Sequence, residues 1–129
     1  MGDITNIIMR SSWETRFAKW CDLNPNVLKW KSEETVVPYR CSTDNIIHRY
    51  YVDFQIQIKD KRGTVKTYLV EIKPFKQTLP PEYPGKRTKR YLEESFNFIK
   101  NQSKWKAAEI YAKERSWEFI ILTEHELGL

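Results

Sequence analysis

Apolar and polar residues alternate along the stretch "YYVDFQIQIK" at 50–59, which is the clearest pattern in the chain. A period of two is typical of a strand with one buried face, and here that face consists of Val52, Phe54, Ile56 and Ile58. A second run, "TVKTYLVEIK", follows after "DKRG", which has Asp first and Gly last as in a type I turn. The pattern predicts a β-hairpin with a three-residue loop, in which Gly63 is left-handed and the numbers of paired residues sum to 124.

Two segments show the spacing of an amphipathic helix. In the first, at 12–23, apolar side chains recur at i, i+4, i+7 and i+8, and "NPN" ends the pattern. These side chains are Trp13, Phe17, Trp20 and Cys21. The second segment, at 89–115, is much longer, and we expect a break in it near Asn101. Its predicted apolar face consists of Tyr91, Phe96, Phe98 and Ile99.

The remaining segments predict short strands and loops. The expected strands are "VLKWK" at 27–31, "TVVPYR" at 35–40, where Pro38 favours an edge position, and "WEFIILTE" at 117–124. The expected loops are "RCSTDN" at 40–45, the Pro-rich segment at 74–90 and a short terminal turn at 125–129. The order helix, strands, helix, strand predicts an α/β fold with a mixed β-sheet flanked by helices.

Composition and charge narrow the class of protein. With 129 residues, 40% of them hydrophobic, the chain predicts a single domain over 1–129 and excludes global disorder. We expect the five tryptophans to be buried. Cys21 and Cys41 belong to no CxxC pair, which predicts free thiols, and no apolar run is long enough to span a membrane. The formal charge of +5 favours an acidic partner, most commonly nucleic acid.

A carboxylate and an ammonium interrupt the second strand of the hairpin at "YLVEIKP". Glu71 and Lys73 are two positions apart and therefore share a face. The predicted register places Asp53 opposite Glu71, with Cβ atoms roughly 5 Å apart, where like charges destabilise a sheet. Two interpretations fit this pattern equally well. One is a site in which Mg²⁺ offsets the repulsion; the other is a solvated face, with Gln55 and Gln57 as neighbours and Lys73 neutralising the acids.

Other charged residues have both a structural and a functional interpretation. Glu14 lies three positions after Ser11, which is the spacing of a capping box at the start of a helix. Basic residues bracket the Pro-rich loop, either as a solvated surface or as phosphate contacts; we favour the contacts, because the loop leaves the strand end that carries Lys73. These basic residues are Lys76, Lys86, Arg87, Lys89 and Arg90. We expect Gln102 and Lys104, on the second helix, to be exposed to solvent.

An Asp in one strand followed by Glu-x-Lys in the next resembles the core of the PD-(D/E)xK nucleases. The resemblance is strongest to phage head-completion nucleases, which are similar to the transposition endonuclease subunit TnsA, and it covers positions 10–127. The matching stretches are "RSSWETRF", "CDLNPNVLKWKSEE", "DNIIHRYYVDF", "YLVEIKPFKQT", "NQSKWKAA" and "EFIILTE". One departure is Val52, where the family pattern usually has Pro before the Asp. Because a proline side chain does not bind a metal, this departure affects the backbone and not the set of metal ligands.

The resemblance implies a role for each matching residue in a single-domain nuclease. Asp53, Glu71 and the Ile72 carbonyl would bind Mg²⁺ or Mn²⁺, and Glu14 would supply a further carboxylate. Lys73 would orient the attacking water or stabilise charge on the phosphate. It is a poor general base, because adjacent carboxylates favour its charged form.

The implied activity is hydrolysis of DNA phosphodiester bonds at packaged phage DNA ends during head completion. DNA is the implied substrate, phage head or portal proteins are the implied partners, and the host cytoplasm or the virion is the implied location. Two alternatives stay open: a DNA-binding structural protein of the phage head without turnover, and a nuclease of the transposition or Holliday-junction type.

Overall fold

The computed structural model describes the backbone of residues 4–128 and the side chains of residues 12–128. Along the chain the elements are α1 (Ile4–Leu23), β1 (Val27–Ser32), β2 (Val36–Arg40), β3 (Ile47–Tyr51), β4 (Phe54–Lys59), β5 (Val65–Ile72), the 3₁₀ helix η1 (Phe75–Thr78), α2 (Lys89–Glu114), β6 (Glu118–Leu122) and α3 (Glu124–Leu127). One sheet has the strand order β1-β4-β5-β6, with β5 and β6 parallel and the other neighbours antiparallel. Strands β2 and β3 form a separate antiparallel pair, the small sheet. The predicted α/β fold, with a mixed sheet flanked by helices, is confirmed.

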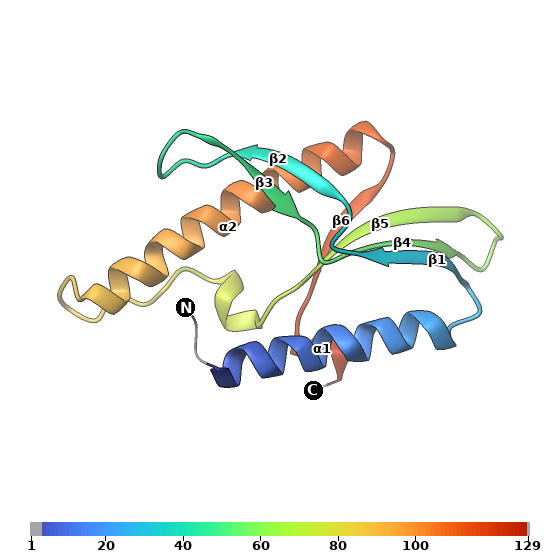
Figure 1. Ribbon diagram of the computed structural model, residues 1–129, viewed down its shortest axis with the longest axis horizontal. Helices are drawn as coiled ribbons and strands as arrows, with labels where there is room; N and C mark the ends of the chain where they lie inside the picture. Colours follow the sequence, from blue (N-terminus) through green and yellow to red (C-terminus); the bar gives the residue numbers. More distant parts are fainter. Residues whose placement is uncertain (1–3, 129) are drawn as a thin grey trace.

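The two long helices cover opposite faces of the four-stranded sheet (Figure 1). α1 packs on one face through an apolar stripe that includes Trp13 and Phe17. α2 and the small sheet lie on the other face, where Trp105 packs. In β5, Leu69 faces α2 and Val70 faces α1, and both are 0% exposed. Burying each such side chain contributes about 1.5–3 kcal/mol, so the central strand is anchored from both sides.

The predicted hairpin and its register are confirmed. β4 and β5 pair from Phe54–Val70 to Lys59–Val65, and the numbers of each pair sum to 124. Gly63 has a φ of 82°, which is the left-handed conformation that the loop requires. The Asp60 side chain accepts hydrogen bonds from the backbone N–H groups of Arg62 and Thr64, both at 2.9 Å, and so holds the loop closed.

The prediction of one continuous strand over 50–59 is wrong. β3 ends at Tyr51 and β4 begins at Phe54, with a bend between them. Val52 packs in the cluster on the α2 side, whereas Phe54 packs on the α1 side, so the two do not share a face. The Val52 N–H donates to the Thr35 carbonyl at 3.0 Å, which ties this residue to the chain segment entering the small sheet. This bond requires an N–H, and proline has none.

α1 starts earlier than predicted, whereas α2 has its predicted limits to within one residue. α1 begins at Ile4, so Ser11 lies inside the helix and cannot be its N-cap, and the predicted capping box is wrong. The segment "ITNIIMR" contains neither Gly nor Pro, so nothing in it stops the helix from starting earlier. α2 has no break near Asn101, because a single Asn lowers helix stability only slightly. Thr88 caps its N-terminus by accepting from the Tyr91 N–H. None of the described helices is long and apolar enough to cross a membrane.

Several aromatic and aliphatic side chains are less buried than predicted. Trp13 and Trp105 are buried as expected, but Trp20 is 45% exposed. On α2, Phe96 and Ile99 are 57% and 41% exposed, although the helical spacing predicted an internal face. The reason is that the main core contacts of α2 come later in the helix, around Ala108 and Ala112. Cys21 and Cys41 are free and buried, in agreement with the prediction.

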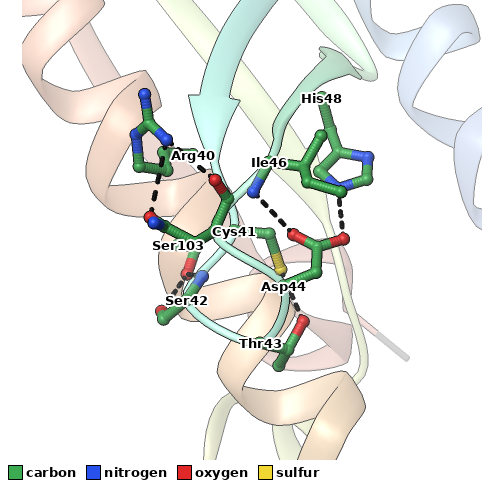
Figure 2. A network of polar contacts seen from close by, with 9 residues as sticks. Arg40, Cys41, Ser42, Thr43, Asp44, Ile46, His48 and Ser103 are labelled. Atoms are coloured by element: carbon green, nitrogen blue, oxygen red, sulfur yellow. Dashed lines mark hydrogen bonds and ion pairs between the residues drawn. The ribbon is translucent and has the colours of Figure 1, made fainter.

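A network of polar contacts fastens the loop of the small sheet to α2 (Figure 2). Asp44 accepts from the Ile46 N–H at 2.9 Å and lies 2.7 Å from His48 Nε2. The Ile46 hydrogen bond and the His48 contact lower the pKa of Asp44. Ser42 Oγ lies 2.8 Å from Ser103 Oγ on α2. The network therefore fixes the position of β3, and β3 leads directly to the bend that holds Asp53.

Candidate active site

Asp53 stands at the bend between β3 and β4, where it is 8% exposed. Its Oδ2 accepts a hydrogen bond from the Ile72 N–H at 2.8 Å. The pairing of β4 with β5 ends at Phe54–Val70, so Asp53 lies just beyond the last strand pair. Asp53 therefore continues the contact between the two strands through its side chain, and the carboxylate is held at the end of β5.

Glu71 and Lys73 lie at the end of β5, 4% and 7% exposed. Lys73 Nζ is 3.6 Å from Glu71 Oε1, which is ion-pair distance. The Lys73 N–H donates to the Leu122 carbonyl at 3.0 Å, which extends the parallel contact with β6. The structure thus brings together four of the predicted site residues: Asp53, Glu71, Ile72 and Lys73.

Burial excludes the interpretation of this face as a solvated one. A buried charge is costly unless it is paired or hydrogen-bonded, and both carboxylates have such partners. Glu71 has Lys73 and Asp53 has a backbone N–H. Solubility does not explain why these charged side chains are buried, whereas a metal or substrate site would explain it.

The donors fit a hard divalent cation in their chemistry. Asp53 and Glu71 offer carboxylate oxygens, and Mg²⁺ typically takes one or two carboxylates together with water and phosphate oxygens. Within the part of the chain that the structure describes, no three His, Cys, Asp or Glu side chains are grouped to hold a metal. Glu14, which is half-buried on α1, therefore forms no such group with Asp53 and Glu71.

Sequence reasoning missed two residues next to this site. The Tyr50 hydroxyl donates a hydrogen bond to Glu71 Oε2. Lys104, expected to be exposed, is half-buried, and its Nζ lies 5.5 Å from the centroid of the Tyr50 ring. Gln102 is exposed as expected. Tyr50 is separated from Glu71 by 21 positions and lies in another sheet, so only its place in the stretch "HRYYVDF" could have drawn attention to it.

A groove of about 980 Å³ opens beside Pro74, directly after Lys73. It is lined by the Pro-rich loop and the first half of α2. Lys76 and Arg90 from the predicted basic cluster line it, together with the acidic residues Glu82, Glu94 and Glu124. Two basic and three acidic side chains do not make a groove that attracts phosphate by charge alone. The groove is therefore not in itself a DNA channel.

The basic cluster is largely exposed to solvent, and Lys86, Arg87 and Lys89 do not line the groove. Lys86 and Arg87 are exposed at the end of the loop, and the side chains of Lys89 and Arg90 are 91% and 84% exposed. Lys104 is 15 residues further along α2 than Lys89, which corresponds to about 22 Å at 1.5 Å per residue. Figure 1 shows this end of α2 remote from the end of β5. Of the five basic residues, Lys76 and Arg90 line the groove beside Pro74.

Comparison with known proteins places the chain in a family. The family model described as "TnsA-like endonuclease N terminal" matches residues 24–124. The chain belongs to the TnsA-like endonuclease family. It is also similar to the head completion nuclease of Enterobacteria phage T4, with 41% identity over 130 aligned positions that cover 98% of this chain and 84% of the relative. No solved structure matches.

These matches confirm the resemblance to TnsA and to phage head-completion nucleases. The TnsA-like region contains Asp53, Glu71 and Lys73, together with all five basic residues of the predicted DNA-contacting cluster. It begins at residue 24, so Glu14 lies outside it. Glu14 is therefore supported as a site residue by neither the TnsA-like match nor the clustering of acidic side chains.

Proposed function

We propose that this chain is a metal-dependent DNA endonuclease with a PD-(D/E)xK core, acting on phage DNA ends during head completion. The observation that carries the proposal is the buried group of Asp53, Glu71 and Lys73 at the adjoining ends of β4 and β5, in a chain of the TnsA-like endonuclease family. Its similarity to the head completion nuclease of phage T4 supports the biological setting.

Asp53, Glu71 and the main-chain carbonyl of Ile72 would hold Mg²⁺ or Mn²⁺. These are the oxygen donors where β4 and β5 meet, and Asp53 already contacts the Ile72 backbone. When bound, the cation supplies an acidified water and neutralises charge on the phosphate. Glu14 lies outside this two-carboxylate group, so we assign it no direct bond to the cation.

Lys73 would donate to a non-bridging oxygen of the scissile phosphate. Its ammonium is 3.6 Å from Glu71 Oε1, so it lies beside the proposed metal ligand. Charge grows on the phosphate oxygens in the transition state, and a fixed cation in a site that excludes water stabilises that charge strongly. Glu71 orients the ammonium.

A structural head protein without turnover is the alternative from another class. The buried charges argue against it, because replacing a buried ion pair with apolar residues is often neutral or stabilising by about 1–4 kcal/mol. A protein with a purely structural role gains nothing from retaining Lys73 beside Glu71. A transposition or junction nuclease would use the same chemistry and would differ in the form of DNA that it cuts.

Incubation with linear, nicked, branched and single-stranded DNA, with Mg²⁺, Mn²⁺ or EDTA, tests the function. We expect cleavage with either cation and none with EDTA. The preferred DNA form separates an end-processing nuclease from a junction nuclease. Binding of DNA without cleavage of any substrate would contradict the proposal and favour the structural alternative.

Changing Lys86, Arg87, Lys89 and Arg90 to Gln should weaken DNA binding for all sequences alike. Each lost duplex phosphate contact should reduce the log–log salt slope by about 0.9.

The matched control for this cluster is the double variant Lys61→Gln and Arg62→Gln. These residues are exposed in the hairpin loop, at the opposite end of the molecule from the start of α2 (Figure 1). The control should keep the wild-type salt slope, as measured by fluorescence anisotropy over a range of salt concentrations. A wild-type slope in the fourfold variant would assign the cluster to solvation.

A further inference from the structure

Tyr50 connects the small sheet with the candidate active site. It lies in β3, is 4% exposed, and packs in the cluster that contains Leu69 and Trp105. Its hydroxyl donates to Glu71 Oε2. An ionised carboxylate has acceptors only, so the phenol is the donor. A hydrogen bond to a charged acceptor is roughly twice as strong as one between neutral groups.

This contact makes the two oxygens of Glu71 unequal. Oε2 is held by Tyr50, whereas Oε1 faces Lys73 Nζ at 3.6 Å, which is too long for a hydrogen bond. The terminal torsion of a Glu side chain is broad, so a carboxylate without such a contact can rotate. With Oε2 held, Oε1 is the oxygen that is available to a cation or a water molecule.

The Tyr50 ring is itself held in place from several sides. Lys104 Nζ on α2 lies over the ring, 5.5 Å from its centroid, where a cation is attracted to the aromatic face. The contact between Ser42 and Ser103 fastens the small sheet to the same helix. The hydroxyl therefore has a fixed direction toward Glu71.

We propose that Tyr50 is a positioning residue for the metal site: its hydroxyl fixes Glu71 so that Oε1 is presented to the cation. This inference rests on the proposed metal-dependent function. Hydrogen-bonding partners of metal ligands typically contribute 10–100-fold to metal affinity or activity, because they orient the ligand before the metal arrives.

Tyr50→Phe tests the proposal, because it removes the hydroxyl and keeps the ring with its packing and its Lys104 contact. We expect Mn²⁺ affinity, measured by calorimetric titration, to fall about 10–100-fold. The Mn²⁺ concentration for half-maximal cleavage should rise by a similar factor, and excess Mn²⁺ should restore part of the rate.

The matched control is Tyr39→Phe, a tyrosine of the same cluster that is 3% exposed and whose ring stacks on His48. It should leave Mn²⁺ affinity unchanged.

If the wild type binds Mn²⁺ and Tyr50→Phe binds it with the same affinity, the positioning role is overturned. A change in the melting temperature of the variant would not alter this conclusion. An equal loss of affinity in Tyr39→Phe would also overturn the positioning role, because the effect would then come from the cluster as a whole. A wild type that neither binds Mn²⁺ nor cleaves DNA would instead refute the proposed function itself.

Discussion

Asp53→Asn is expected to abolish both metal-dependent cleavage and the stabilisation of the protein by Mg²⁺. The amide oxygen of Asn can still accept the hydrogen bond from the Ile72 N–H, so the end of β5 should keep its structure. A neutral amide is a much poorer ligand than a carboxylate for a hard cation. The substitution also removes the repulsion between Asp53 and Glu71, so the metal-free variant should be at least as stable as the wild type.

The size of the effect follows from binding linkage. A cation that binds only the folded state at ten times its Kd adds about 1.4 kcal/mol to the free energy of unfolding. For a domain of this size that is a rise in Tm of roughly 5 °C. The wild type should show this rise in a thermal melt with Mg²⁺, and Asp53→Asn should not.

Asp60→Asn is the matched control for this substitution. Asp60 also accepts backbone hydrogen bonds, from Arg62 and Thr64, but it lies in the hairpin loop away from the site. Asn is accepted in such turns, so this variant should keep the wild-type response to Mg²⁺. Equal responses of Asp53→Asn and wild type to Mg²⁺ would show that no cation binds at Asp53.

Lys73→Met is expected to separate the chemical step from metal binding. Met has a similar length and no charge, so the buried site keeps its volume and loses only the ammonium. Removing one fixed group that stabilises transition-state charge typically lowers the rate by about 10²–10³. The two carboxylates lose a neutralising neighbour, so Mg²⁺ should stabilise this variant as much as the wild type or more.

The metal-free Lys73→Met protein should be less stable than the wild type, by about 1–3 kcal/mol, because Glu71 loses a buried partner. Single-turnover cleavage and thermal melts with and without Mg²⁺ measure the two effects separately. Lys66→Met, an exposed lysine near the opposite end of β5, is the control and should cleave normally. Cleavage by Lys73→Met above a tenth of the wild-type rate would remove Lys73 from the catalytic set.

The sequence alone determined the local geometry of the hairpin. The alternating pattern, Asp60 and Gly63 together predicted its register, and the structure confirms the register pair by pair. Side chains on a strand alternate in direction whatever surrounds them, so the shared face of Glu71 and Lys73 also followed from spacing. The TnsA-like resemblance was equally visible in the sequence, because it depends on short motifs.

Only the tertiary structure decided which sheet each strand joins. A strand of the small sheet and a strand of the main sheet show the same alternation of apolar and polar residues. The sequence pattern over 50–59 therefore does not reveal the bend at Asp53. The same bend sends Tyr50 to Glu71 across two sheets, a contact between residues 21 positions apart that no local periodicity encodes. The length of α2 likewise places Lys89, at the start of this helix, about 22 Å from Lys104. The sequence alone does not show this distance, because it does not show how α2 packs on the sheet. Periodicity determines the direction of a side chain within its own element, whereas the packing of whole elements determines which side chains meet.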